Sequence, residues 1–150
     1  MSNDERLVYV ALGGAGEIGM NMYAYGWGKP GAERWILVDM GVTFPNMDGS
    51  PGVDLITADP GFIAERRDRL EAIFITHGHE DHVGALGMLW HRVETPVYCR
   101  AFTGLVARDK MERYGLDPSH LLREHQRPRA HVLAGPGRDA HHYGHAAPAH

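Results

Sequence analysis

The stretch "IFITHGHEDHVGAL", residues 73–86, decides how this chain is interpreted. It opens with a short apolar run typical of a buried strand and closes with the apolar spacing of a helix. Between the two, residues 77–82 read H-x-H-x-D-H, which places four metal-ligand side chains within six positions. A lone histidine is usually structural or solvated, but this density at a strand-to-helix junction predicts a metal centre.

The spacing of these residues favours two ions. Alternate residues of extended backbone point the same way, so His77 and His79 converge on one ion. Asp81 and His82 lie at the start of the helix and turn toward a second ion, and they are also the candidate catalytic residues. Imidazole and carboxylate suit zinc, with manganese as the alternative. We therefore predict two divalent metal ions, a pair that activates water and clamps a phosphoryl or acyl centre. Glu80 is expected to be exposed and not a ligand.

Asp39 ends a second apolar run, "WILVDM", residues 35–40. One interpretation makes it the cap of a helix or turn. The other makes it an acid that hydrogen-bonds to a metal ligand and orients it. The local sequence leaves both open.

A glycine-rich stretch, "LGGAGEIGMN", residues 12–21, offers a competing function. Gly14, Gly16 and Gly19 fit G-x-G-x-x-G, and Asp39 follows twenty residues later, as in dinucleotide-binding folds. Such a fold needs a helix that begins inside the pattern. The residues that follow alternate like a strand and contain further glycines, each costing about 1 kcal/mol in a helix relative to alanine. The stretch therefore predicts a tight β-turn and no cofactor-binding residues for a dinucleotide.

The rest of the chain alternates strands with helices and indicates an α/β (α+β) fold. We expect strands over residues 7–12, 21–27, 34–40, 72–76 and 96–100, and helices over residues 60–72, 81–93 and 103–115. The first three strands are expected to form an antiparallel meander, with a turn at Pro30-Gly31. Asp59 and Thr103 are the expected caps of the first and last helices, and Gly115 is the expected end of the last. Residues 41–60 are expected to form an ordered loop.

Composition limits the function classes. A chain of 150 residues suits one domain, and a formal charge of −4 supplies no general basic field for nucleic acid. Cys99 is the only cysteine, which excludes a disulfide framework and a cysteine-based zinc cluster. The N-terminus lacks the features of a signal peptide, and no apolar run approaches the roughly 20 residues that span a bilayer. We expect a cytoplasmic protein with no membrane partner.

The end of the chain differs from the rest. Seven of the eleven histidines fall within residues 120–150, and the apolar periodicity fails after about residue 125. We expect residues 1–125 to form the N-terminal part of the domain and residues 126–150 to be an irregular tail rich in histidine, proline and glycine. The abrupt change suggests that the native frame or sequence is lost there, so that the chain is truncated or frameshifted.

H-x-H-x-D-H after a buried strand resembles the metallo-β-lactamase superfamily. Other motifs follow in the expected order and are similar to the ribonuclease J family, in the β-CASP branch: "LGGAGEIGMNMY", "LVDMGVTFP", "GVDLITADP" and "PVYCRAFTGLVARDKM". The resemblance runs from about Leu7 to about Gly115. It implies an αββα sandwich of which this chain holds about the first half.

The resemblance also implies roles for individual residues. His77 and His79 would hold one metal, Asp81 and His82 the second, and Asp39 would match the first motif of the superfamily. RNA is the implied partner, hydrolysed from a 5′-monophosphate end and internally during rRNA processing and decay. Full-length members imply a homo-oligomer.

The chain also departs from the family, whose members continue with a further histidine ligand, a bridging aspartate and an inserted domain. His145 falls about where that histidine is expected, and "HAAP" keeps a histidine three residues before a proline. The preceding "DAHHYG" does not resemble the strand that should deliver it, and His141 and His142 share the ambiguity. Two alternatives therefore stand beside a ribonuclease: a non-catalytic metal-binding fragment and another hydrolase of the superfamily.

Overall fold

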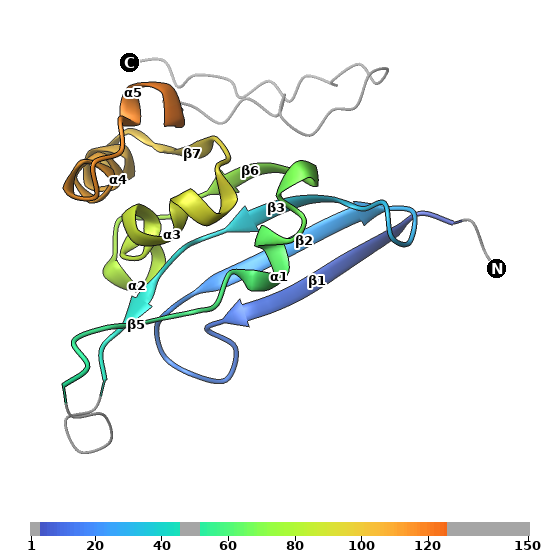
Figure 1. Cartoon of the computed structure of the whole chain (residues 1–150), viewed down its shortest axis with the longest axis horizontal. Helices are drawn as coiled ribbons and strands as arrows, with labels where there is room; N and C mark the ends of the chain where they lie inside the picture. Colours follow the sequence, from blue (N-terminus) through green and yellow to red (C-terminus); the bar gives the residue numbers. More distant parts are fainter. Residues whose placement is uncertain (1–3, 46–51, 126–150) are drawn as a thin grey trace, which may run out of the picture.

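The fold is organised around a six-stranded sheet, shown in Figure 1 by a computed structural model that describes residues 4–45 and 52–125. The strand order is β1-β2-β3-β6-β7-β8, and β4 and β5 form a separate pair. The elements are β1 (Arg6–Gly13), β2 (Met22–Gly28), β3 (Arg34–Val38), β4 (Val42–Thr43), β5 (Ile56–Thr57), α1 (Gly61–Ala64), the 3₁₀ turn η1 (Arg67–Arg69), β6 (Leu70–Phe74), α2 (Glu80–Val83), α3 (Leu86–Val93), β7 (Val97–Arg100), α4 (Ala101–Arg113), α5 (Pro118–Leu121) and β8 (Leu122–His125). The expected α/β fold class is confirmed.

The sheet changes direction at β3. Strands β1, β2 and β3 form the predicted antiparallel meander, with Tyr9 opposite Tyr25 and Tyr25 opposite Ile36. From β3 onward the pairs β3–β6, β6–β7 and β7–β8 are parallel, and each connection runs through helical segments. The carboxyl ends of β3 and β6 therefore lie at the same edge of the sheet, where functional loops of α/β folds gather.

The helices pack on one face of the sheet. Alternate side chains of β3, including Trp35 and Leu37, are buried in a core shared with Leu86 of α3 and Met111 of α4. The Trp35 ring meets Phe62 of α1 edge-on, with 5.2 Å between ring centroids. The other face of β1 and β2 is more open, because Tyr9 remains 54% exposed.

Two of the expected helices are wrong in extent. The expected helix over residues 60–72 is only the short α1 followed by η1, and β6 already begins at Leu70, which pairs with Trp35 of β3. Burial in the sheet prevails there over local helical spacing. The expected helix over residues 81–93 is divided into α2 and α3, because the Ala85 N–H donates to the Met40 carbonyl at 2.9 Å.

The other boundaries differ less. Helix α4 begins at Ala101, so Thr103 lies buried within its first turn and does not cap it. Asp59 does accept a hydrogen bond from Gly61 N–H at 2.9 Å, next to the start of α1. Gly115, with φ +72°, follows the end of α4 as expected. The expected loop over residues 41–60 contains the short strands β4 and β5, which pair with each other through backbone contacts that the local sequence does not indicate, and α5 and β8 are further elements outside the prediction.

Residues 126–150, with His145, His141 and His142, lie outside the described residues, as does part of the expected loop, residues 46–51. Among the helices of the described part, none has the length and apolar character to cross a membrane.

Candidate metal centre

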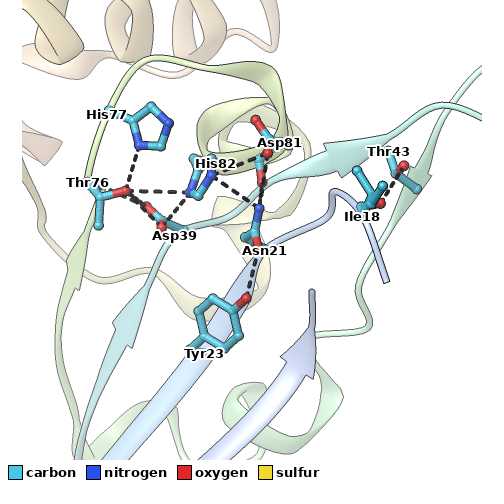
Figure 2. A network of polar contacts seen from close by, with 9 residues as sticks. All are labelled: Ile18, Asn21, Tyr23, Asp39, Thr43, Thr76, His77, Asp81 and His82. Carbon is cyan, nitrogen blue, oxygen red and sulfur yellow. Dashed lines mark hydrogen bonds and ion pairs between the residues drawn. The ribbon is translucent and has the colours of Figure 1, made fainter. Parts of the chain in front are cut away.

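The candidate site lies where four segments meet at the edge of the sheet (Figure 2). Asp39 follows β3, His77 follows β6, and Asp81 and His82 lie in α2. Asn21 directly precedes β2. Segments up to 61 residues apart in the sequence thus contribute side chains to one polar network.

Backbone contacts hold these segments together. The Asn21 N–H donates to the Asp81 carbonyl at 3.0 Å, and the Gly41 N–H donates to the Asn21 carbonyl at 3.0 Å. The Met40 N–H donates to the His82 carbonyl at 2.8 Å. A Cβ built at Gly41 would lie 1.6 Å from the Asp81 carbonyl oxygen, so only glycine permits this approach. Backbone hydrogen bonds alone therefore hold the start of α2 against the residues that follow β3 and precede β2.

Asp39 is the buried acceptor of the site. It is 2% exposed, and its backbone has φ +63°, a conformation that aspartate tolerates better than most residues. Oδ1 accepts the Thr76 N–H at 2.8 Å, and the Thr76 hydroxyl lies 3.0 Å from Oδ1 and 2.9 Å from Oδ2. Asp39 thus contacts a distant segment and caps no helix.

Asp39 also determines how His82 faces the site. Asp39 Oδ2 lies 2.8 Å from His82 Nδ1, and a carboxylate only accepts, so Nδ1 carries the proton. The Nε2 atom lies on the opposite side of the ring. There it faces Asp81 Oδ2 at 3.3 Å and Asn21 Nδ2 at 3.2 Å.

Thr76 orients the imidazole of His77 in the same way. The Thr76 hydroxyl proton is directed at the Asp39 carboxylate, so its oxygen accepts from His77 Nδ1 at 3.0 Å. The Nε2 atom of His77 is then also left for a ligand role. The His77 ring centroid lies 4.0 Å from that of His82 and 4.7 Å from that of His79, so the three imidazoles form one cluster.

These residues fit divalent metals in the chemistry of their donor atoms. Imidazole nitrogen and carboxylate oxygen are the donors that zinc takes, and the hydrogen bonds from Asp39 and Thr76 orient two of the imidazoles as metal sites require. Within residues 4–45 and 52–125, however, no three His, Cys, Asp or Glu side chains already converge as a ready metal cage. The ligand roles of His77, His79, Asp81 and His82 stay predictions.

Glu80 is engaged elsewhere. Its Oε1 lies 2.6 Å from Nζ of Lys110 in α4, while its side chain is 47% exposed. The carboxylate therefore links α2 to α4, away from the imidazole cluster.

Sequence reasoning missed Thr76, Asn21 and Tyr23. The Tyr23 hydroxyl donates to Asn21 Oδ1 at 2.8 Å, and Asn21 Nδ2 reaches Asp81 and His82. Burial raises the pKa of Tyr23, with smaller effects from Tyr9 and Asp39, so its hydroxyl keeps its proton. The glycine stretch carried a signal: a Cβ at Gly14 would lie 2.4 Å from Asn21 Oδ1 and 2.5 Å from the Tyr23 hydroxyl oxygen.

Comparisons with known proteins identify the family of the chain. The sequence pattern of the Metallo-beta-lactamase superfamily matches residues 19–150. "Ribonuclease J" of Sinorhizobium meliloti is 56% identical over 103 residues, which cover 69% of this chain and 18% of that protein. "Ribonuclease J" of Mycolicibacterium smegmatis is 43% identical over 112 residues, covering 74% and 19%. "Ribonuclease J2" of Bacillus subtilis is 35% identical over 122 residues, covering 81% and 21%. The chain thus spans about a fifth of the length of these relatives.

Proposed function

The chain belongs to the metallo-β-lactamase superfamily, and from that membership we propose that it supplies the metal-binding part of a ribonuclease. The similarity to several ribonuclease J proteins is the observation that favours RNA over other substrates of the superfamily. The oriented imidazoles of His77 and His82 support a hydrolytic metal centre at this edge of the sheet.

In this proposal His77 and His79 hold one metal ion, and Asp81 and His82 hold the second. Zinc is the proposed metal, with manganese as the alternative, and His145 is proposed as a further ligand. Bound ions supply Lewis acidity to the phosphoryl group and lower the pKa of a water molecule. Asp39 contributes by keeping the Nδ1 proton of His82 in place, so that Nε2 remains a donor of electron density.

The proposed substrate is an RNA phosphodiester, cut from a 5′-monophosphate end and internally, in rRNA processing and RNA decay. The proposal includes a cytoplasmic location, no membrane partner and a homo-oligomeric whole protein. Because the chain spans about a fifth of its relatives, activity is assigned to the whole protein, and this chain alone is expected to be inactive or weakly active.

A second candidate is a metal-binding segment without catalysis. For the isolated chain this candidate is favoured by the small share of the relatives' length that it spans, about a fifth. A third candidate, another hydrolase of the superfamily, is disfavoured by the ribonuclease J similarity.

Labelled 5′-monophosphorylated RNA with added zinc or manganese tests the proposal. The whole protein that contains this chain is compared with its His79→Ala variant, which removes a predicted ligand, and with Glu80→Gln, which changes a neighbouring residue paired with Lys110. Cleavage lost only in His79→Ala supports the ribonuclease. Zinc binding without cleavage supports the second candidate, and hydrolysis of a thioester or lactone but not RNA supports the third.

A further inference from the structure

The amide of Asn21 occupies the space between two predicted ligands. Its Nδ2 lies 3.2 Å from Asp81 Oδ2 and 3.2 Å from His82 Nε2. The same nitrogen donates to the Asp81 backbone carbonyl at 3.0 Å. One –NH₂ group therefore faces the two side-chain atoms that the proposed function assigns to a metal ion (Figure 2).

The orientation of this amide is fixed by its surroundings. The carbonyl and carboxylate oxygens of Asp81 only accept, so Nδ2 and not Oδ1 must face them. On the other side, Oδ1 accepts from the Tyr23 hydroxyl at 2.8 Å. A flipped amide would set its oxygen against two acceptor oxygens of Asp81 and turn its –NH₂ group toward the donating hydroxyl of Tyr23.

The geometry points to Asn21 as a positioning residue for the Asp81–His82 pair, held in orientation by Tyr23. In the metal-free chain the amide holds both ligand atoms toward one point. A metal displaces its contact with His82, since Nε2 has one lone pair, whereas the hydrogen bond to the Asp81 carbonyl is retained. This inference rests on the proposed function, because it assigns Asp81 and His82 to a metal.

A purely architectural role is already filled by the backbone. The Asn21 N–H donates to the Asp81 carbonyl, and the Asn21 carbonyl accepts from Gly41 N–H, each at 3.0 Å. These bonds dock the turn against α2 whatever side chain stands at position 21. The Asn21 side chain therefore adds orientation of Asp81 and His82, and its removal is expected to leave the fold intact.

The glycine stretch contributes a matched pair of substitutions. Gly14 and Gly16 both have positive φ, +79° and +80°, so alanine strains the backbone at either position. Only a Cβ at Gly14 would collide with Asn21 Oδ1 and the Tyr23 hydroxyl, while a Cβ at Gly16 meets nothing within 4 Å. Gly14→Ala should therefore disturb the amide, and Gly16→Ala should not.

Zinc affinity of the whole chain, measured by competition with a chromogenic chelator, tests the inference. Asn21→Ala is expected to weaken zinc binding by about tenfold or more, the usual loss when a group supporting a metal ligand is removed. Tyr23→Phe and Gly14→Ala should show smaller losses. Gly16→Ala and Thr43→Val, which removes a hydrogen bond to the Ile18 carbonyl in the same region, should bind zinc as the wild type does. Thermal unfolding of each metal-free variant separates this effect from general destabilisation.

A second measurement needs no metal. The side-chain amide protons of Asn21, assigned by NMR through their loss in Asn21→Ala, should exchange with solvent slowly in the wild type and faster in Tyr23→Phe. Zinc affinity of Asn21→Ala equal to or tighter than that of the wild type overturns the inference. If the wild type binds no zinc, the metal centre of the proposed function fails; the exchange measurement then decides, and exchange as fast as in a free peptide overturns the role of Asn21.

Discussion

Asp39 and His82 stand 43 residues apart in the sequence, yet carboxylate Oδ2 lies 2.8 Å from imidazole Nδ1. The contact joins the residue after β3 to the last residue of the H-x-H-x-D-H motif, which lies in α2. The same carboxylate accepts the backbone N–H of Thr76, at the end of the neighbouring strand. One buried acid thus sets the relative position of both halves of H-x-H-x-D-H.

Asp39→Asn tests that role without changing the backbone requirement, because asparagine also tolerates the φ of +63°. The asparagine amide keeps one acceptor oxygen, but its –NH₂ group replaces the other oxygen and faces a donor of Thr76 or His82. We expect a loss of about 10–100-fold in zinc affinity and of about 1–3 kcal/mol in unfolding free energy. Zinc competition and urea unfolding measure the two effects. Asp59→Asn, at an exposed acid that accepts from Gly61 N–H, is the control; equal losses in both variants would refute the assignment.

Gly41→Ala tests the backbone docking of α2. The new Cβ would lie 1.6 Å from the Asp81 carbonyl oxygen, a backbone atom that cannot turn aside. We expect destabilisation at or above the upper end of the roughly 1–3 kcal/mol typical of overpacking, with weakened zinc binding because α2 must shift. Gly31→Ala strains a positive φ in open space and serves as control. It should lower stability modestly and leave zinc affinity unchanged, and Gly41→Ala with unchanged zinc affinity would contradict the docking argument.

Local sequence predicted those parts of the fold that depend on local chemistry. The alternating residues of the strands and the Pro30-Gly31 turn were sufficient to predict the meander. The six residues 77–82 were sufficient to name the candidate ligands. Leu70 was misassigned to a helix because its strand state comes from pairing with Trp35, far away in the sequence. The break at Ala85 likewise depends on the distant Met40 carbonyl.

The supporting residues of the site could not be found in the same way. Asn21 contacts Asp81, 60 residues later, and the glycine stretch before it indicates a tight turn but not which residue the Asn21 side chain meets. Thr76 precedes His77 directly, but its meaning depends on Asp39 folding back onto it. The role of Asp39 stayed open in the sequence, because an aspartate is equally suited to capping a turn and to orienting a metal ligand.

Stability in acid should depend on Glu33. The Arg6 guanidinium hydrogen-bonds to this carboxyl and lowers its pKa from 4.5 to about 2. The folded state therefore keeps the carboxylate charged while the unfolded chain takes up a proton, so this contribution is present above about pH 4.5 and is lost as the pH falls toward 2. The difference in unfolding free energy between the wild type and Glu33→Gln should be largest near neutral pH and shrink on acidification. Arg6→Met should abolish most of that pH dependence, and a difference independent of pH would show that Glu33 is not so coupled.

The open face of the meander, formed by Leu7, Tyr9, Tyr25, Trp27 and Ile36, predicts how the isolated chain behaves in solution. These residues share one side of the sheet through the pairs Leu7–Trp27, Tyr9–Tyr25 and Tyr25–Ile36. Leu7 is 77% exposed and Tyr9 54%, so the face presents apolar and aromatic surface to solvent. Contiguous surface of this kind drives association.

We therefore expect the chain to self-associate as its concentration rises and to bind a dye that reports apolar surface. Leu7→Lys places a charge on that surface, in the edge strand β1, at a position too exposed to contribute to the core, so it should reduce association and dye binding with little change in stability. Leu105→Lys makes the same change at a residue of α4 that is 65% exposed but lies outside the open face. Sedimentation velocity at several concentrations distinguishes the two variants. An equal effect of both substitutions would mean that net charge, rather than the open face of the sheet, controls association.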